Sequence, residues 1–128
     1  MTYIWIGMGG AIGSMLRYIT SLLLPPVSGF PLGTLTVNLI GCLILGFLSS
    51  QADTNWSASP QVKMAIKTGL IGSFTTMSAV STELVVLLQS ERYGIALLYF
   101  TLSLLGGLCL AALGMRLGNL TVNRRKVK

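Results

Sequence analysis

Four apolar stretches, each long enough to cross a lipid bilayer as a helix, occupy most of this sequence. They run over residues 4–24, 32–50, 62–89 and 94–117, and about 20 apolar residues suffice for one helical crossing. Charged residues make up only 9% of the 128 residues, against about a quarter in ordinary soluble domains. This number of charged residues is too small to form the surface of a soluble domain. We therefore expect a single all-α membrane domain with four transmembrane helices.

The basic residues predict an orientation in the membrane. Four spans place both termini on the same side, and lysine and arginine favour the cytoplasmic side. Arg17 and Arg92 belong to the opposite side. The side with the termini carries the other basic residues, which are Lys63, Lys67 and, in or just before the tail 118–128, Arg116, Arg124, Arg125, Lys126 and Lys128. We therefore expect cytoplasmic termini and a tail that faces anionic lipid rather than nucleic acid.

The residue types also exclude several classes of chemistry. Histidine is absent, which removes the commonest acid–base residue and metal ligand. Cys42 and Cys109 both lie in apolar stretches, so neither a disulfide framework nor a thiolate metal site is expected. Hydrolase triads and most metalloenzymes are thus disfavoured, and no catalytic residue is predicted.

The first span carries a run of small residues and one charge. Gly9 and Gly13 are four residues apart in "GMGGAIGS", a spacing that lets helix backbones approach closely. Arg17 follows within the same span. Its guanidinium either reaches the membrane interface, as long basic side chains do, or forms a fixed positive charge that attracts anions to a vestibule.

The third span contains an unusual polar run, "GSFTTMSAVSTE", from Gly72 to Glu83. Its glycine and hydroxyl residues weaken a helix and offer competing hydrogen bonds, so we predict a break near Gly72–Ser78. Irregular backbone at this depth must line a cavity or be buried in protein. The alternative is an unbroken helix whose hydroxyls bond to carbonyls one turn back. Glu83 lies after the predicted break, and three roles are open to it. It is a neutral carboxyl group that forms hydrogen bonds, the partner of a cation, or an anion that reaches the membrane interface. The hydroxyl side chains concerned are Thr75, Thr76, Ser78, Ser81 and Thr82.

Two further spans each have polar residues along one face. Thr34 and Asn38 are one helical turn apart in the second span, and Tyr99, Ser103 and Gly107 recur at four-residue intervals in the fourth. An asparagine inside the membrane is a functional candidate by default, although hydrogen bonding between helices explains it equally well. The Tyr–Ser pair alone is more typical of packing, because buried hydroxyls are usually satisfied locally.

Together these groups predict a path for a small ion. Amide, hydroxyl and backbone N–H donors with one arginine, and no ring of carboxylates, suit an anion. One subunit with four helices can hardly enclose a pore, so a dimer is expected.

At this point the sequence resembles a known family, the bacterial fluoride channels (Fluc, also called CrcB), over nearly its whole length. The motifs that carry the resemblance are "GGAIGSMLRY", "GTLTVNLIG", "GLIGSFTTMS" and "YFTLSLLGG". The resemblance implies a bacterial inner-membrane protein that passes fluoride passively through two pores. It also implies a dimer of subunits that run antiparallel, with the third helix broken.

The resemblance also implies roles for individual residues. Asn38 would line the pore with Thr34, Tyr99 and Ser103, and Arg17 would match the arginine of the first helix. Glu83 would match the third-helix glutamate. Backbone carbonyls of Gly72 and Thr75 would hold a structural sodium ion at the dimer interface.

The chain departs from the family pattern at pore positions. Met77 and Val80 stand where the family has phenylalanines, whose electropositive ring edges suit a dehydrated anion, and Gly107 replaces a serine. Either the chain is one member of a heterodimer, which we favour slightly, or it is a homodimer whose pores work without these rings. A proton-coupled exporter of the small multidrug type, or a non-conducting assembly subunit, is the alternative; such exporters place their essential glutamate in the first span.

Overall fold

The computed structural model describes residues 2–51 and 58–126, with side chains described as far as Val122. Within these ranges every regular element is helical, apart from one isolated bridge between Val27 and Phe30. The elements in chain order are α1 (Thr2–Leu23), α2 (Leu32–Ser50), α3 (Pro60–Met64), the π-helical segment η1 (Ala65–Ile71), α4 (Gly72–Phe74), α5 (Met77–Gln89), α6 (Tyr93–Thr101), the π-helical segment η2 (Leu102–Gly106) and α7 (Gly107–Lys126).

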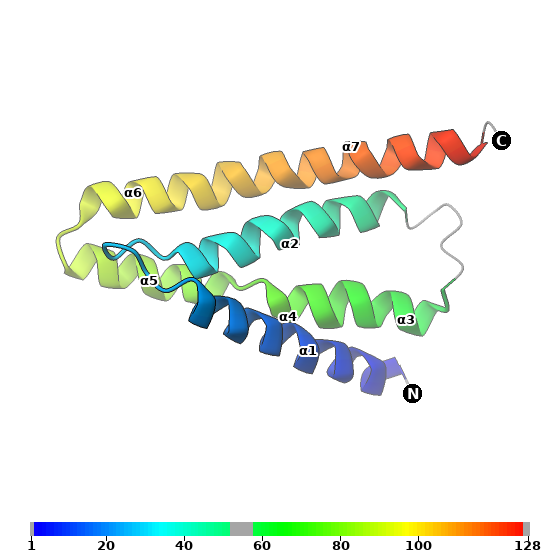
Figure 1. Cartoon of the computed structure of the whole chain (residues 1–128), viewed down its shortest axis with the longest axis horizontal. Helices are drawn as coiled ribbons and strands as arrows, with labels where there is room; N and C mark the ends of the chain where they lie inside the picture. The colour runs from blue at the N-terminus through cyan, green and yellow to red at the C-terminus, as the bar shows by residue number, and fades with distance from the viewer. Residues whose placement is uncertain (1, 52–57, 127–128) are drawn as a thin grey trace.

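The helices form an elongated bundle (Figure 1). α2 packs along α7 and also contacts η1, α4 and α5, while α1 packs against η1 and α4. The α1–α2 connection and the α5–α6 turn lie at one end of the bundle, and both chain termini lie at the other. The arrangement brings α2, α5 and α6 together near the end that carries the two turns.

Glycines allow α1 to approach the third helical run closely. Gly9 and Gly13, the pair predicted to permit tight packing, are both buried. A methyl group added at Gly9 would overlap the backbone carbonyl of Ala65, and one at Gly13 would overlap that of Leu70. Only glycine fits at these contacts, and the backbones therefore meet directly.

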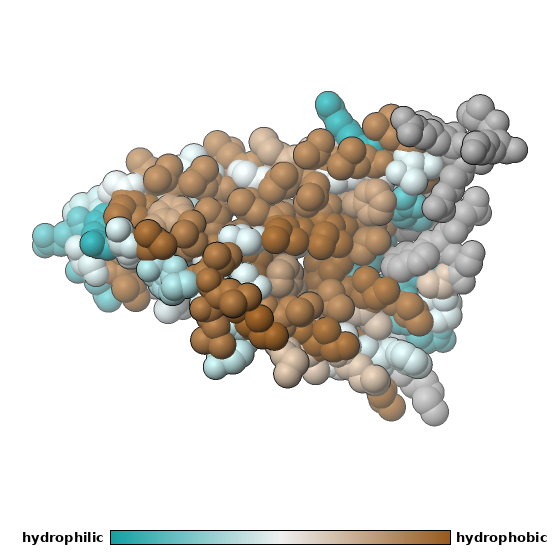
Figure 2. All heavy atoms as spheres, in the orientation of Figure 1, coloured by the Kyte–Doolittle hydropathy of each residue, from teal (hydrophilic) through white to brown (hydrophobic). Residues whose placement is uncertain are grey.

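The core is small and the apolar surface is large. The buried apolar side chains near the turn end are those of Leu35, Val80, Leu87, Ala96 and Tyr99. Large apolar side chains are exposed along every helical run, and Figure 2 shows them covering the middle of the molecule, with hydrophilic residues gathered toward its ends. This surface is what a bilayer requires of a protein that crosses it.

Three of the four predicted spans are long and apolar enough to cross a membrane by length and composition. They are Leu32–Ser50, Pro60–Gln89 and Tyr93–Val122. α1 has the length but falls short in mean hydropathy, because Arg17 and several small residues interrupt its apolar side chains. The final helix also continues beyond the predicted end at Leu117, to Lys126. The side chains of the last basic residues, 124–128, lie outside the described part.

The third helical run is not continuous. α4 ends at Phe74, and the backbone is extended at Thr75 (φ −77°, ψ 154°) and Thr76 (φ −151°, ψ 122°) before α5 begins at Met77. The Thr76 hydroxyl accepts a hydrogen bond from the backbone N–H of Ala79 at 3.2 Å. Thr76 therefore acts as the N-cap of α5, a position where threonine is favoured.

Candidate functional site

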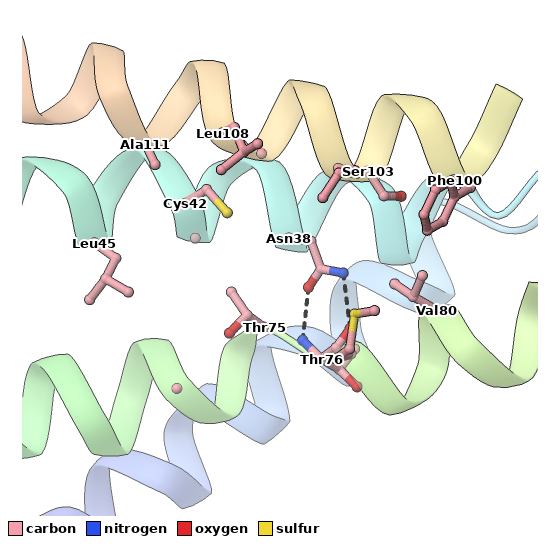
Figure 3. Close-up of a pocket in the computed structure, with 15 residues that line it drawn as sticks. Asn38, Cys42, Leu45, Thr75, Thr76, Val80, Phe100, Ser103, Leu108 and Ala111 are labelled. Carbon is pink, nitrogen blue, oxygen red and sulfur yellow. Dashed lines mark hydrogen bonds between the residues drawn. The ribbon is translucent and has the colours of Figure 1, made fainter.

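Asn38 hydrogen-bonds to the extended backbone between α4 and α5. Its Nδ2 donates to the carbonyl of Thr76 at 2.9 Å, and its Oδ1 accepts from the Thr76 N–H at 2.8 Å. Figure 3 shows the side chain reaching from α2 to this backbone, with both bonds drawn. Backbone groups freed from a helix inside a membrane need such partners. The asparagine thus replaces two helical hydrogen bonds that the break removes.

A second polar cluster joins three helices nearer the turn end. Thr34 Oγ1 in α2 donates to Glu83 Oε1 in α5 at 2.6 Å, and Tyr99 Oη in α6 donates to Glu83 Oε2 at 2.6 Å. Both oxygens of the carboxyl group therefore accept a hydroxyl. Of the three readings that the sequence left open for Glu83, this geometry matches a carboxyl group held by hydrogen bonds within the bundle.

The donors that remain free are the ones that could serve an ion. Among the described residues, Ser103 Oγ is the one buried side-chain polar atom with no hydrogen-bond partner. An asparagine amide has two N–H groups, and Asn38 uses one of them on Thr76. Thr34 and Tyr99, by contrast, already donate to Glu83. Ser103 and Asn38 therefore offer the unused donors of this region.

Ser103 and Asn38 line the same open cavity, whose volume is about 490 Å³. Thr34 and Tyr99 are not among its lining residues. Met77 lies at its edge and is 69% exposed, whereas Val80 is 2% exposed and belongs to the core beside Tyr99. Met77 and Val80, the two positions where the resemblance implied phenylalanines, therefore have different surroundings. The cavity residues singled out from the sequence are Asn38, Gly72, Thr75, Thr76, Met77, Val80, Ser103 and Gly107.

The hydroxyls of α5 bond locally. Ser81 donates to the carbonyl of Met77 at 3.1 Å, and Thr82 donates to that of Ser78 at 3.0 Å. The Ser78 hydroxyl lies 3.1 Å from that of Thr76. Ser81 and Thr82 thus bond to carbonyls one turn back, as expected for an unbroken helix, although the helix is broken just before them.

Two further predicted sites have distinct environments. The hydrogen bonds of the described residues include none to the backbone carbonyls of Gly72 and Thr75, and both residues border the cavity. Arg17 lies half-buried on α1, and the described part of the chain provides no ion pair or hydrogen bond for its guanidinium. It is not among the residues that line the cavity.

Comparison with known proteins places the chain in a family. Residues 4–115 match the family model described as CrcB-like protein, Camphor Resistance (CrcB). The chain belongs to this family. It is 43% identical over 110 residues to the fluoride-specific ion channel FluC of Oceanobacillus iheyensis, covering 86% of this chain and 85% of the relative. It is 42% identical over 120 residues to the FluC of Methylobacillus flagellatus, with 91% and 94% covered.

A numbered relative extends this similarity. The fluoride-specific ion channel FluC 1 of Staphylococcus aureus is 39% identical over 118 residues, which cover 92% of this chain and 97% of the relative. Family membership and the three apolar helical runs identify this CrcB-family chain as an all-helical, multi-pass membrane protein.

Sequence reasoning missed how the polar residues group. It placed Thr34 with Asn38, and Tyr99 with Ser103, because each pair shares a helix face. The structure also joins Thr34 and Tyr99 through Glu83. It also adds Phe30, whose ring lies against Tyr99 with centroids 5.7 Å apart. Helical spacing shows which residues share a face but not which faces meet, so no signal within one span could have found this group.

Proposed function

We propose that this chain is a subunit of a channel that conducts fluoride passively out of the bacterial cytoplasm. Its relatives are named as fluoride-specific ion channels. The observation that carries the proposal is that Ser103 and Asn38, each with a hydrogen-bond donor that no described residue uses, line the same cavity. A lining without charged residues that offers free hydrogen-bond donors suits a small anion.

The residues of the chain would replace the water around the anion. Fluoride holds its hydration shell tightly, so a dry passage must offer donors at close range. Ser103 and Asn38 supply donors that no other group uses. The hydroxyls of Thr34 and Tyr99 could donate to the anion only if they gave up their hydrogen bonds to Glu83. The cluster therefore holds two further donors beside the path. Arg17 would raise the local anion concentration near one mouth.

The open cavity supports a dimer, in which we propose that the two subunits run antiparallel. A membrane protein cannot leave Asn38 and the carbonyls of Gly72 and Thr75 facing lipid, because lipid offers no hydrogen-bond partners. A second subunit that covers the cavity removes this penalty. We propose that α1, many of whose apolar side chains are exposed, also crosses the membrane, so that each subunit has four spans.

A structural sodium ion fits the residues at the break. Sodium prefers oxygen ligands, and the carbonyls of Gly72 and Thr75 accept no hydrogen bond from the described residues. When bound between two subunits, the ion would be coordinated by these carbonyl oxygens and would satisfy them. The chain's own residues contribute by holding the break open, through the pair of hydrogen bonds between Asn38 and Thr76.

The pairing of subunits depends on Met77 and Val80. Val80 is enclosed within its own subunit, but Met77 is 69% exposed beside the cavity, where it would meet a partner. We favour a heterodimer in which an inverted paralogue supplies the aromatic rings that this chain lacks. The numbered name of the Staphylococcus aureus relative, FluC 1, fits a genome with more than one such subunit.

Flux from proteoliposomes tests the function and the pairing together. The chain is reconstituted alone and with a paralogue from the same genome, and fluoride and chloride efflux are recorded with ion-selective electrodes. We expect rapid fluoride efflux and little chloride efflux from the pair. Equal chloride efflux would remove the fluoride assignment, and full fluoride efflux from this chain alone would remove the requirement for a partner. A substrate-driven proton flux abolished by Glu83→Gln would favour an exporter.

A further inference from the structure

The connection between α1 and α2 is a rigid turn. Val27 and Phe30 exchange backbone hydrogen bonds, with Val27 N–H donating at 3.1 Å and Phe30 N–H at 2.9 Å. Between them, Ser28 (φ 51°) and Gly29 (φ 84°) both have positive φ, the pattern of a type I′ turn. This geometry fixes the direction in which Phe30 leaves the turn.

The turn between α5 and α6, at the same end of the bundle, is also well defined. The N–H of Arg92 donates to the carbonyl of Leu87 at 2.9 Å, and that of Glu91 donates to Leu88 at 3.1 Å. Glu91 has a φ of 57°, so α5 ends in a Schellman motif. Arg92 therefore leaves α5 from a fixed backbone position.

Arg92 connects the two turns. Its Nη1 donates to the carbonyl of Ser28 at 2.6 Å. A methyl group added at Gly29 would overlap the same guanidinium nitrogen. The guanidinium thus lies directly on the glycine, and a larger residue there would displace it. We call this set of interactions, which involves Arg92, Ser28 and Gly29, the Arg92 contact.

The turn that Arg92 holds ends at the polar cluster. Phe30 meets Tyr99 edge to face, with an interplanar angle of 79°, a preferred geometry for aromatic pairs. Tyr99 is 0% exposed, and its hydroxyl donates to Glu83. Thr34, which donates to the same carboxyl group, lies in the first turn of α2, just after Phe30. The position of one turn therefore determines the positions of two of the three members of the cluster.

We propose that the Arg92 contact and Phe30 are positioning elements of the conduction path, which together hold the Tyr99 hydroxyl against Glu83 and close the turn end of the cluster to water. This inference rests on the proposed function only where it concerns conduction. Arg92 touches neither the cavity nor the cluster, so it acts through the turn and Phe30. Its guanidinium lies on the surface and acts by holding the turn in place, not by attracting the anion.

Nitration of Tyr99 tests the geometry without any need for flux. The full chain in liposomes is treated with tetranitromethane, and nitrated tyrosines are located by mass spectrometry. Tyr93, which is 63% exposed, serves as the internal reference. We expect Arg92→Ala and Gly29→Ala to raise nitration of Tyr99 relative to Tyr93 by about five- to tenfold, a factor within the range that loss of one ordinary hydrogen bond implies. Arg116→Ala, which removes an exposed arginine from α7, should leave it unchanged.

Fluoride flux tests the positioning role. In the conducting protein, Arg92→Ala should raise the half-saturating fluoride concentration several-fold, while the maximal flux changes less. Arg92→Ala in a Tyr99→Phe background should not change the half-saturating fluoride concentration further, because the tyrosine hydroxyl that Arg92→Ala would displace is already absent. A purely structural role would lower the melting temperature in both backgrounds and leave half-saturation unchanged.

The outcomes separate the two proposals. Unchanged nitration of Tyr99 in both variants would overturn the inference, whether or not the chain conducts. Increased nitration with unaltered half-saturation would overturn the positioning role. Absence of fluoride flux from the wild type, alone and paired, would count against the proposed function, and the nitration result would still decide whether the Arg92 contact holds Tyr99.

Discussion

Replacing Asn38 with aspartate should nearly abolish anion flux. The amide makes two hydrogen bonds to the Thr76 backbone, one as donor and one as acceptor. An aspartate keeps the acceptor but loses the donor, which leaves the Thr76 carbonyl unpaired at a penalty of about 1–3 kcal/mol. The change therefore disturbs the break between α4 and α5 and adds a negative charge beside the cavity.

The added charge has the larger effect on conduction. Two like unit charges about 4 Å apart repel by about 4 kcal/mol at an effective dielectric constant of about 20. Because about 1.4 kcal/mol corresponds to a tenfold change in an equilibrium constant, anion occupancy near residue 38 should fall by roughly a thousandfold. We expect fluoride efflux from Asn38→Asp to fall by at least about a hundredfold, since protonation of the aspartate would relieve part of this repulsion.

Two variants separate charge from structure. Asn38→Ala removes both hydrogen bonds without adding charge, so it should lower the melting temperature but reduce fluoride efflux less than the aspartate does. Asn119→Asp makes the same chemical change at an exposed position on α7 and should leave efflux unaltered. Each is measured by electrode-recorded efflux and a thermal melt. Wild-type efflux from a correctly folded Asn38→Asp protein would show that Asn38 lies outside the conduction path.

Three further predictions concern packing, the polar cluster and sodium. Gly114→Ala should destabilise the protein by about 1–3 kcal/mol, because the new methyl group would overlap the carbonyl of Leu43; Gly94→Ala, where nothing lies within 4 Å, is the matched control in a thermal melt. Tyr99→Phe removes a hydrogen bond to Glu83 and should lower stability by about 1.5–3 kcal/mol and change the half-saturating fluoride concentration; no change in either would show that this bond does not matter. Replacing sodium with N-methylglucamine during purification should reduce fluoride efflux and lower the melting temperature, and equal values in both cations would argue against a bound sodium ion.

The apolar pattern of the sequence predicted much of the fold. The second helix has the bounds Leu32–Ser50 that hydropathy indicated, because a glycine and proline cluster precedes it and a polar run follows it. The polar run from Gly72 predicted irregular backbone, and Thr75 and Thr76 are extended in the structure. These features are local, so a single span contains the information that determines them.

Contacts between spans could not be predicted in the same way. The sequence left the role of Glu83 open because its two hydroxyl partners come from α2 and α6, far away along the chain. The π-helical segment η2, which contains Ser103, changes the direction in which following side chains point. A regular helical repeat does not anticipate this change. Tertiary packing therefore determined which of the predicted polar residues meet.

The two polar groups of the site place different demands on the same bundle. The pair of hydrogen bonds between Asn38 and Thr76 satisfies backbone groups that the break exposes, so it is needed for folding as well as for conduction. The Glu83 cluster satisfies only side chains, and an apolar core could have replaced it without leaving a backbone group unpaired. A chain that folds in lipid, where such hydroxyls and carboxyls are disfavoured, has no structural need for the cluster. We therefore expect substitutions at Thr34, Glu83 and Tyr99 to alter anion passage in addition to stability, and substitutions at Asn38 also to disturb the break between α4 and α5.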